Sequence, residues 1–254
     1  MHTETYINSH PLVSVIFLSY KRPHLLKEAF YAFISGTNYP REKLELILCD
    51  DGSPEFMQEE IRNIPFDKFL FSKENNGLGA NSNKGIQNAC GEYILQIQDD
   101  WILNGNPNYL YFGIKIFEEY NDIALIRYRL GREFNYSEIR TCTMPYIKVK
   151  ILSRDNREEL FLYSDNPHLK KASFHHLLGP YLEGKKMELT EIDMCKKFLN
   201  KREWNSAVID SCENIFSHIG AQESHRKKNN VKDFLYKIMM SNKYLSNLIK
   251  KYKY

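Results

Sequence analysis

The amino-acid sequence predicts an α/β protein with a single doubly wound sheet, mixed but mainly parallel, and helices flanking it. Two observations carry this prediction. Leu12–Leu18 is a continuous apolar run of the kind that fills a parallel strand buried on both faces. Short apolar runs then alternate with stretches of helical length as far as Ile97, and strands that alternate with helices at this spacing form parallel sheets.

The first half of the chain gives a clear signal for each element. Pro23 suits the first turn of a helix running to about Ser35, because the fixed backbone angle of proline is already helical. Pro54 opens another helix after the turn Asp50-Asp51-Gly52-Ser53, in which Ser53 is a candidate cap and Asp50 a brace for the loop. The other predicted elements are strands at Leu44–Cys49, Phe66–Phe71 and Tyr93–Ile97 and a helix at Ala80–Cys90.

The pattern is looser after Trp101. We expect Asp165–Pro180 to be irregular and polar, with His168, His175 and His176 in surface or packing roles rather than as ligands. Thr190 begins a predicted helix in which Asp193 and Lys197 have the i,i+4 spacing of an ion pair. The remaining predictions are a helix at Pro107–Tyr120, strands at Ile123–Leu130 and Tyr146–Leu152, a mixed region over 132–157 and a short apolar segment at Asn214–Gly220.

The charge is distributed unevenly along the chain. From Ser224 onward there are nine basic residues and one acid, so this tail carries +8 and the rest of the chain −5 of the total of +3. Val231–Tyr254 has apolar residues near helical spacing with lysines between them, which predicts a basic amphipathic helix suited to an anionic membrane surface or to packing on the domain. No basic stripe with interleaved aromatic residues occurs in the body, so nucleic acid is not an expected partner.

The five cysteines are scattered and none has zinc-ligand spacing, which indicates a reducing compartment and no structural metal. The polar start of the chain lacks a signal-peptide pattern, and no apolar run approaches the roughly 20 residues that span a bilayer. We therefore expect a cytoplasmic protein, with peripheral attachment to a membrane through the tail as the alternative.

The stretch Gly91–Trp101 carries the strongest functional signal. Its strand stops on two adjacent carboxylates, Asp99 and Asp100, and the carboxyl ends of strands are where open α/β sheets bind ligands. Adjacent carboxylates repel each other unless a cation or sugar hydroxyls lie between them, and hard divalent metals prefer oxygen ligands. The alternative is a strand end capped by solvated acids, and the pair alone does not decide between the two.

Two common nucleotide-binding classes are excluded by their motifs. The glycines Gly77 and Gly79 lack the third glycine of a dinucleotide fingerprint and do not follow the first strand. The chain also has no GxxxxGK[ST] motif, which excludes a P-loop NTPase. A sugar-nucleotide pyrophosphorylase would carry a glycine-rich basic loop after the first strand, where this chain has SYKRP.

Four segments in order resemble the nucleotide-binding half of family 2 glycosyltransferases of the GT-A fold: SYKRP, LCDDGS, NNGLGANSNKGIQNACGEYI and QDDW. LTEID and FSHIG are shorter, later matches, so the resemblance covers roughly Leu12–Gly220. It implies a GT-A domain over 1–223, with a nucleotide-binding half at about 12–105 and an acceptor half at about 106–223. The basic tail, 224–254, lies outside the resemblance.

The resemblance also implies roles for the donor-binding residues. Tyr20 and Asp51 would hold the nucleobase, commonly uracil, since an aromatic face stacks a base and a carboxylate accepts an imide N–H. Asn83, in the third segment, and Asp99 would complete the nucleotide-sugar site, with Asp99 on the ribose. Trp101 is a candidate floor for the sugar, with core packing as the alternative.

The metal and the base follow from the same resemblance. Asp100 would bind the divalent metal, Mn²⁺ or Mg²⁺, that bridges the diphosphate, and His218 would be a second ligand. Glu191 would be the general base at a helix start. The chain departs from the family pattern at Gln98, which replaces the usual first acid, and at Thr190-Glu191, which leaves Glu188 and Asp193 open as alternative bases.

The sequence therefore predicts an inverting, metal-dependent glycosyltransferase that moves a sugar from a nucleoside diphosphate sugar, most readily UDP-linked, to a hydroxyl of a glycan or glycoconjugate. The rival prediction is a non-catalytic module that binds a nucleotide sugar or glycan in a degenerate GT-A site. The sugar, the acceptor and the linkage are not fixed by the sequence.

Overall fold

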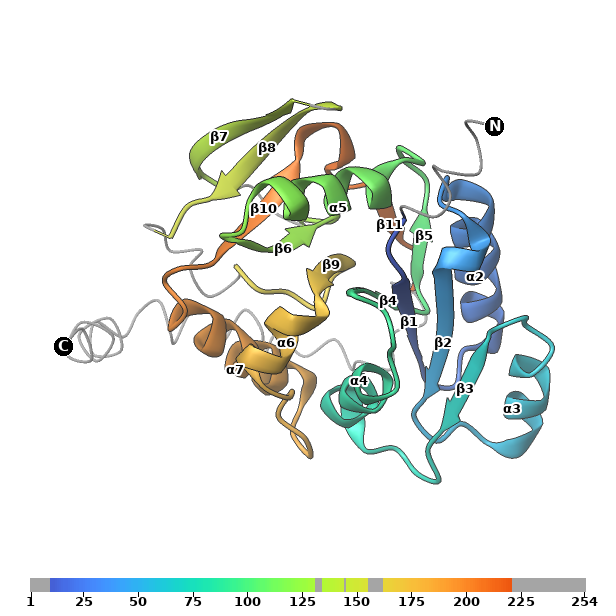
Figure 1. Cartoon of the computed structure of the whole chain (residues 1–254). Helices are drawn as coiled ribbons and strands as arrows, with labels where there is room; N and C mark the ends of the chain where they lie inside the picture. The colour runs from blue at the N-terminus through green and yellow to red at the C-terminus, as the bar shows by residue number, and fades with distance from the viewer. Residues whose placement is uncertain (1–9, 131–133, 144, 155–161, 221–254) are drawn as a thin grey trace. The chain divides into compact units, whose positions relative to one another are not determined.

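Among the described residues, the central sheet has nine strands in the order β3-β2-β1-β4-β9-β6-β10-β8-β7 (Figure 1). The computed structural model describes residues 10–130, 134–143, 145–154 and 162–220. The strands of this sheet are β1 (Val13–Ser19), β2 (Leu44–Asp50), β3 (Lys68–Phe71), β4 (Tyr93–Gln98), β6 (Ile123–Arg127), β7 (Tyr136–Thr143), β8 (Tyr146–Leu152), β9 (His168–Lys171) and β10 (Asn205–Ile209). A second, two-stranded sheet pairs β5 (Trp101–Leu103) with β11 (Phe216–His218).

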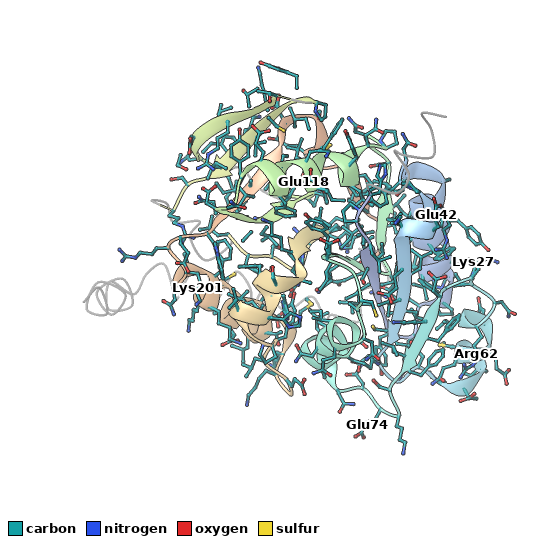
Figure 2. All side chains as sticks on the ribbon, in the orientation of Figure 1. Lys27, Glu42, Arg62, Glu74, Glu118 and Lys201 are labelled. Atoms are coloured by element: carbon teal, nitrogen blue, oxygen red, sulfur yellow. The ribbon has the colours of Figure 1, made fainter. Side chains whose placement is uncertain are left out.

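The helices are α2 (Pro23–Gly36), α3 (Glu55–Ile61), α4 (Gly77–Gln87), α5 (Tyr109–Glu119), α6 (Ala172–Leu178) and α7 (Met187–Leu199). Short 3₁₀ turns lie at Arg41–Lys43 and Asp210–Cys212. Charged side chains such as Lys27, Arg62 and Glu74 lie at the periphery of these elements (Figure 2).

The first four strands of the sheet are all parallel, as predicted. β1 pairs with β2 on one side and with β4 on the other, and every residue of β1 is buried. Phe17 packs in one core cluster with Phe30 of α2, whereas Ile16 packs in the other with Ile86 of α4. Burial on both faces explains why this strand, apart from Ser14 and Ser19, is apolar throughout rather than alternating.

The other half of the sheet is mixed, and its topology decides where the site lies. β9 runs antiparallel to both β4 and β6, so β4 and β6 point the same way. β10 is parallel to β6, and the β7–β8 hairpin completes the edge. The carboxyl ends of β1, β2, β4 and β6 therefore all lie at one edge of the sheet.

The prediction that Asp165–Pro180 is irregular was wrong, because this stretch forms β9 and α6. β9 has the sequence HLKK, yet His168, Leu169 and Lys170 are all fully buried. The Lys170 Nζ donates hydrogen bonds to Gln96 Oε1 at 3.2 Å and to Tyr163 Oη at 3.0 Å. Gln96 is 74 residues away in the chain and Tyr163 only seven, but neither contact leaves an apolar pattern that marks the strand.

Burial in this cluster lowers the pKa of Lys170 from 10.5 to about 7. Between these values the unfolded chain holds more protons than the folded protein, so the lysine makes the free energy of unfolding rise with pH. Relative to Lys170→Met, wild type should gain roughly 2–3 kcal/mol between pH 7 and pH 9. Denaturant melts of both proteins at the two pH values measure this gain, and parallel pH profiles would contradict it.

Several element boundaries also differ from the prediction. α7 begins at Met187, three residues before Thr190, and α4 begins at Gly77 rather than Ala80. The strands β5, β7 and β10 were not predicted as separate elements, because β5 and β10 are short and β7 alternates weakly. Asp193 and Lys197 form the predicted i,i+4 ion pair at 2.7 Å.

The first compact unit of the chain ends at Ile219. The predicted boundary at 223 and the predicted amphipathic helix at Val231–Tyr254 lie outside the described residues. Within the described part, no helix combines the length and the apolar character needed to span a bilayer.

Candidate active site

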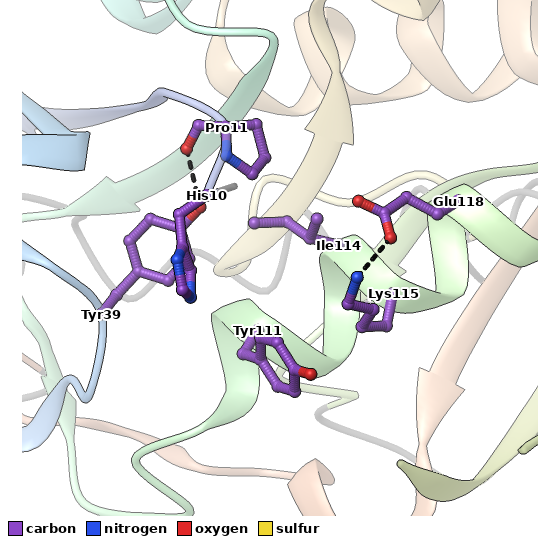
Figure 3. A pocket seen from close by; sticks show the side chains of 7 residues that line it. All are labelled: His10, Pro11, Tyr39, Tyr111, Ile114, Lys115 and Glu118. Carbon is purple, nitrogen blue, oxygen red and sulfur yellow. Dashed lines mark hydrogen bonds and ion pairs between the residues drawn. The ribbon is translucent and has the colours of Figure 1, made fainter. Parts of the chain in front are cut away.

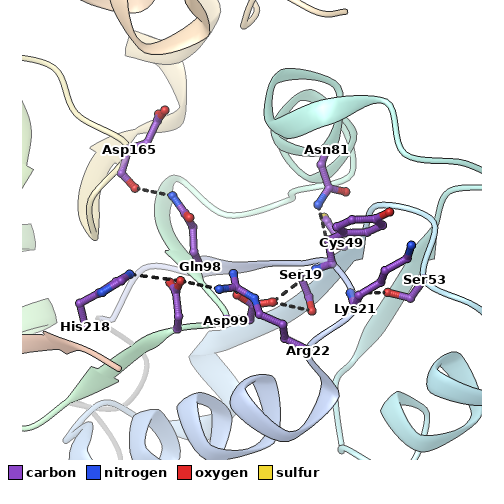
Figure 4. A network of polar contacts seen from close by, with 12 residues as sticks. Ser19, Lys21, Arg22, Cys49, Ser53, Asn81, Gln98, Asp99, Asp165 and His218 are labelled. Carbon is purple, nitrogen blue, oxygen red and sulfur yellow. Dashed lines mark hydrogen bonds and ion pairs between the residues drawn. The ribbon is translucent and has the colours of Figure 1, made fainter. Parts of the chain in front are cut away.

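The Asp99 carboxylate lies at the end of β4 and is fully buried. Its Oδ2 accepts hydrogen bonds from Ser19 Oγ at 2.9 Å and from the Tyr20 amide at 3.3 Å, and its Oδ1 binds the Arg22 guanidinium (Figure 4). Burial raises the pKa of Asp99 to about 7, and the charge of Arg22 opposes that rise. Asp99 thus holds the loop after β1 against β4, and the ribose contact expected of it stays a prediction.

Asp100 meets His218 although 117 residues separate them in the chain. The His218 Nε2 lies 3.2 Å from Asp100 Oδ2, and the two-stranded sheet holds His218 opposite Trp101. The Trp101 and His218 rings meet edge-on, with their centroids 4.9 Å apart. The two metal ligands implied by the sequence are therefore neighbours in the fold.

Arg22 is a site residue that the sequence prediction missed. Its Nη1 donates to Asp100 Oδ2 at 2.8 Å while its Nη2 binds Asp99, so one guanidinium spans both acids. It offsets the repulsion between two adjacent buried carboxylates, which is otherwise costly. The available signal was a basic residue in SYKRP, the loop that follows the first strand.

Asp51 and Ser53 fix the loops beside this acid pair. Asp51 Oδ1 accepts the Asn76 amide at 3.0 Å and Oδ2 the Gly77 amide at 2.9 Å, so this carboxylate anchors the start of α4. Ser53 donates to Asp50 Oδ2 at 2.6 Å and accepts the Lys21 amide at 2.8 Å, which confirms Asp50 as a brace for its loop. Each Asp51 oxygen has a second lone pair for a ligand N–H.

Lys21 is held in an unusual backbone conformation between Tyr20 and Arg22. Its φ is 57°, a left-handed value that non-glycine residues rarely adopt. The hydrogen bond from its amide to Ser53 stabilises this turn. As a result Tyr20, which is half-buried, follows directly on the end of β1, where the sequence predicts a nucleobase platform.

Asn83 joins α4 to the segment that precedes α7. Its Nδ2 donates to the Tyr181 carbonyl at 2.9 Å and to Glu183 Oε1 at 2.7 Å, and its Oδ1 accepts the Tyr181 amide at 2.8 Å. The side chain is buried and fastens the segment before α7 onto α4. Asn83 thus has a structural contact in the fold, and its expected part in the nucleotide-sugar site stays a prediction.

Glu191 lies in the second turn of α7, not at the helix start as predicted. Its Oε1 accepts hydrogen bonds from Ser164 Oγ at 3.1 Å and from the Asp165 amide at 3.4 Å. The Asp165 carbonyl in turn accepts a hydrogen bond from Gln98 Nε2 at 3.3 Å (Figure 4). This connection brings Glu191 to the edge of the sheet where β4 ends in Asp99 and Asp100.

His168 and His175 are buried packing residues, as the sequence predicts. His168 Nδ1 lies 2.8 Å from the Asn166 carbonyl, and the His175 ring stacks on Tyr181 with centroids 5.6 Å apart. Burial lowers the pKa of both imidazoles, to about 2 for His175.

The donor set at Asp100 fits a divalent cation that a ligand completes. Asp100 Oδ1 is buried and accepts no hydrogen bond from a described residue, and the His218 imidazole lies beside the same carboxylate. No group of three or more His, Cys, Asp or Glu side chains among the described residues could hold a metal alone. Mg²⁺-type sites commonly use one or two carboxylates together with substrate phosphates and water, which matches this arrangement.

A separate cavity of about 170 Å³ lies at the opposite, amino end of the strands (Figure 3). Pro11 precedes β1 there, and Tyr39, Tyr111 and the Lys115–Glu118 ion pair contribute to its lining. Because the candidate catalytic residues lie at the carboxyl ends, this cavity is not part of the site.

Residues 14–178 match the sequence model of the family described as Glycosyl transferase family 2. An uncharacterized glycosyltransferase of Rickettsia felis is 31% identical over 120 residues, which cover 46% of this chain and 19% of that protein. This chain therefore matches only about a fifth of the length of that relative.

Two solved structures share the fold at low sequence identity. S. aureus TarS 1–349 in complex with UDP-GlcNAc gives a TM-score of 0.59 at 18% identity, covering 91% of this chain and 67% of that one. The mannosyltransferase PcManGT from Pyrobaculum calidifontis, in complex with GDP-Man and Mn²⁺, gives 0.56 at 16% identity, covering 80% and 57%. The mixed, mainly parallel sheet with flanking helices is thus the GT-A fold that the sequence predicted.

Proposed function

The chain belongs to glycosyl transferase family 2, and we propose that it transfers a sugar from a nucleoside diphosphate sugar to a hydroxyl of a glycan or glycoconjugate, with inversion at the anomeric carbon. The observation that carries this proposal is the meeting of Asp100, His218 and Glu191 at one edge of the sheet. These residues come from three separate segments, and they would supply a metal site and a base.

The donor would lie across the carboxyl ends of β1, β2 and β4. Tyr20 and Asp51 would hold the base, and a uracil imide N–H suits the carboxylate of Asp51 as acceptor. The two similar structures hold UDP-GlcNAc and GDP-Man, which supports a nucleotide sugar as the donor class. We propose a UDP-linked donor for this chain.

Asp100 and His218 would hold a Mn²⁺ or Mg²⁺ ion against the diphosphate. When bound, the ion neutralises charge on the leaving diphosphate. Arg22 keeps the Asp100 carboxylate oriented and leaves its Oδ1 available. One carboxylate and one imidazole hold a cation weakly without a ligand, so we expect metal and nucleotide to bind together.

Glu191 would take the proton of the acceptor hydroxyl as that oxygen attacks the anomeric carbon. The bond between the sugar and the diphosphate breaks on the opposite face, which inverts the anomeric centre. The Ser164 and Asp165 donors bind Glu191 Oε1 and so fix the orientation of the carboxylate that receives the proton. No covalent intermediate on the protein is required.

The second candidate is a module that binds a nucleotide sugar without turning it over. Gln98 favours it, because this residue replaces the first acid of the family pattern and its amide donates to the Asp165 carbonyl. A thermal-shift panel of nucleotide sugars with and without Mn²⁺ tests ligand binding, since ligands of the native state raise its stability. We expect the largest shift with a UDP-sugar plus Mn²⁺, and no shift with any nucleotide sugar would contradict both candidates.

We propose further that residues 224–254 attach the protein to anionic membrane surfaces through their net charge of +8. Deleting the residues after Asn230 should abolish co-sedimentation with vesicles containing phosphatidylserine. The full chain on neutral phosphatidylcholine vesicles is the control, because it removes only the lipid charge. Equal sedimentation of the full and shortened chains would remove the membrane role.

A further inference from the structure

Arg129 stands apart from the other half-buried arginines. Arg22 and Arg140 each bind two carboxylates, and Arg154 donates to three backbone carbonyls. Over the ranges that the structure describes, no carboxylate or carbonyl pairs with the Arg129 guanidinium. A guanidinium left without an anion keeps its planar fork of N–H donors available to the carboxylate or phosphate of a ligand.

The guanidinium lies over the ring of Trp101, with its carbon 5.9 Å from the ring centroid. Trp101 meets His218 edge-on, and His218 lies beside Asp100. Arg129 is therefore connected to the proposed metal ligands through a single aromatic ring. A guanidinium stacked on an aromatic face keeps its N–H donors in the plane of the fork, where they can bind an oxyanion at two points.

The backbone around Arg129 is also fixed. The Arg129 carbonyl accepts a hydrogen bond from Arg127 Nη2 at 3.3 Å, and the next amide, of Leu130, donates to Asn214 Oδ1 at 3.1 Å. The Arg129 side chain therefore projects from a backbone position that hydrogen bonds hold in place, two residues past the carboxyl end of β6. Less conformational entropy is lost when such a residue binds an anion.

The place of β6 in the sheet indicates which substrate Arg129 faces. β6 is two strands beyond β4, on the side away from β1 and β2. At ~4.8 Å per strand its end lies roughly 10 Å from the end of β4. The nucleoside would lie over β1 and β2, so Arg129 belongs to the acceptor side of the site.

We propose that Arg129 binds an anionic group, phosphate or carboxylate, of the acceptor, so that the enzyme acts on an anionic glycan or glycoconjugate. This inference rests on the proposed function for the identity of the ligand as an acceptor. The binding of an oxyanion at Arg129 stands on the geometry alone.

Trp101 offers a direct readout, because the chain has only one other tryptophan, Trp204. Trp204 packs on Phe174, with ring centroids 4.7 Å apart, outside the site. In a Trp204→Phe background, inorganic phosphate and glucuronate are titrated at constant ionic strength, with glucose as the neutral control. We expect the anions, but not glucose, to change the Trp101 fluorescence in a saturable way.

Arg129→Gln in the same background should weaken anion binding by roughly ten- to a hundred-fold, the range for losing charged hydrogen bonds. Arg129→Lys keeps the charge but not the two-pronged guanidinium, so its affinity for the anion should lie between that of the parent protein and that of Arg129→Gln. Arg140→Gln is the matched control: Arg140, in β7, is bound to Asp122 and Glu138, so this substitution should leave the titration unchanged. No saturable response to either anion, or equal responses in wild type and Arg129→Gln, would overturn the proposal.

Repeating the titration with UDP and Mn²⁺ present separates the acceptor from the donor. Binding of the anion to the UDP-saturated protein supports an acceptor subsite. Competition between UDP and the anion would assign Arg129 to the diphosphate and overturn the acceptor proposal. A protein that binds the anion but not UDP would instead refute the proposed donor, so the two failures are distinguishable.

Discussion

Glu191→Gln should lower kcat by roughly 10²- to 10⁴-fold, the usual contribution of a general base, while donor binding changes little. The glutamine Oε1 can keep both hydrogen bonds that Glu191 accepts, from Ser164 and from the Asp165 amide. The substitution therefore removes proton acceptance with little change in shape. Steady-state rates and UDP affinity, measured on the same protein, check both halves of the expectation.

Two nearby acids on α7 provide matched controls. Asp193 pairs with Lys197, and Glu188 lies in the first turn of the helix. Asp193→Asn and Glu188→Gln should keep rates near wild type. If Asp193→Asn were inactive and Glu191→Gln active, the general base would be Asp193 and not Glu191. If all three variants remain active, the proposed mechanism lacks its base.

Asp100→Asn should abolish the stabilisation by UDP that depends on Mn²⁺ or Mg²⁺. An asparagine can still accept the Arg22 hydrogen bond through its carbonyl oxygen, but its amide nitrogen is not a metal ligand. The fold should survive, because the polar partners of the Asp100 side chain are Arg22 and His218, both at the rim of the sheet. Thermal melts with UDP, with and without metal, measure the effect.

His218→Ala should reduce the metal-dependent rise in melting temperature less than Asp100→Asn does, because it removes a neutral ligand rather than a charged one. Manganese electron paramagnetic resonance provides a readout independent of stability. Because UDP alone also binds Mn²⁺, we expect free Mn²⁺ to fall further on adding UDP to wild type than on adding it to Asp100→Asn or to buffer. If Asp100→Asn showed the same metal-dependent rise in melting temperature as wild type, another residue would hold the metal.

The first half of the fold could be predicted because its signals are local. Leu12–Leu18 is buried on both faces, and Pro23 and Pro54 mark helix starts, so each element follows from its own residues. β9 could not be predicted in this way, because its His168 and Lys170 are polar residues in a buried strand. They are tolerated there because they form hydrogen bonds with Asn166, Gln96 and Tyr163. Such partners depend on the finished fold.

In the candidate site, too, the residues with a local signal could be predicted and those whose partners depend on the fold could not. Asp99 and Asp100 follow a strand whose end is visible in the sequence. The roles of His218 and Glu191 near that strand end were predicted only from the family resemblance. Arg22 was missed because a basic residue in a loop has no pattern of its own until the two acids it spans are placed. Asn83 lies within a matching segment but contacts Tyr181 and Glu183, which shows that a motif position does not fix a side chain's partners.

The central claim is that the edge of the sheet around Asp100 and Glu191 catalyses sugar transfer, and release of UDP from UDP-sugars by the purified protein tests it most directly. Even without an acceptor, a metal-dependent transferase hydrolyses its donor slowly. We predict UDP release from at least one UDP-sugar with Mn²⁺, lost on chelation and in Asp100→Asn. Binding of the same UDP-sugar with no UDP released by wild type, with or without a panel of anionic and neutral glycan acceptors, would contradict the claim and leave a binding module.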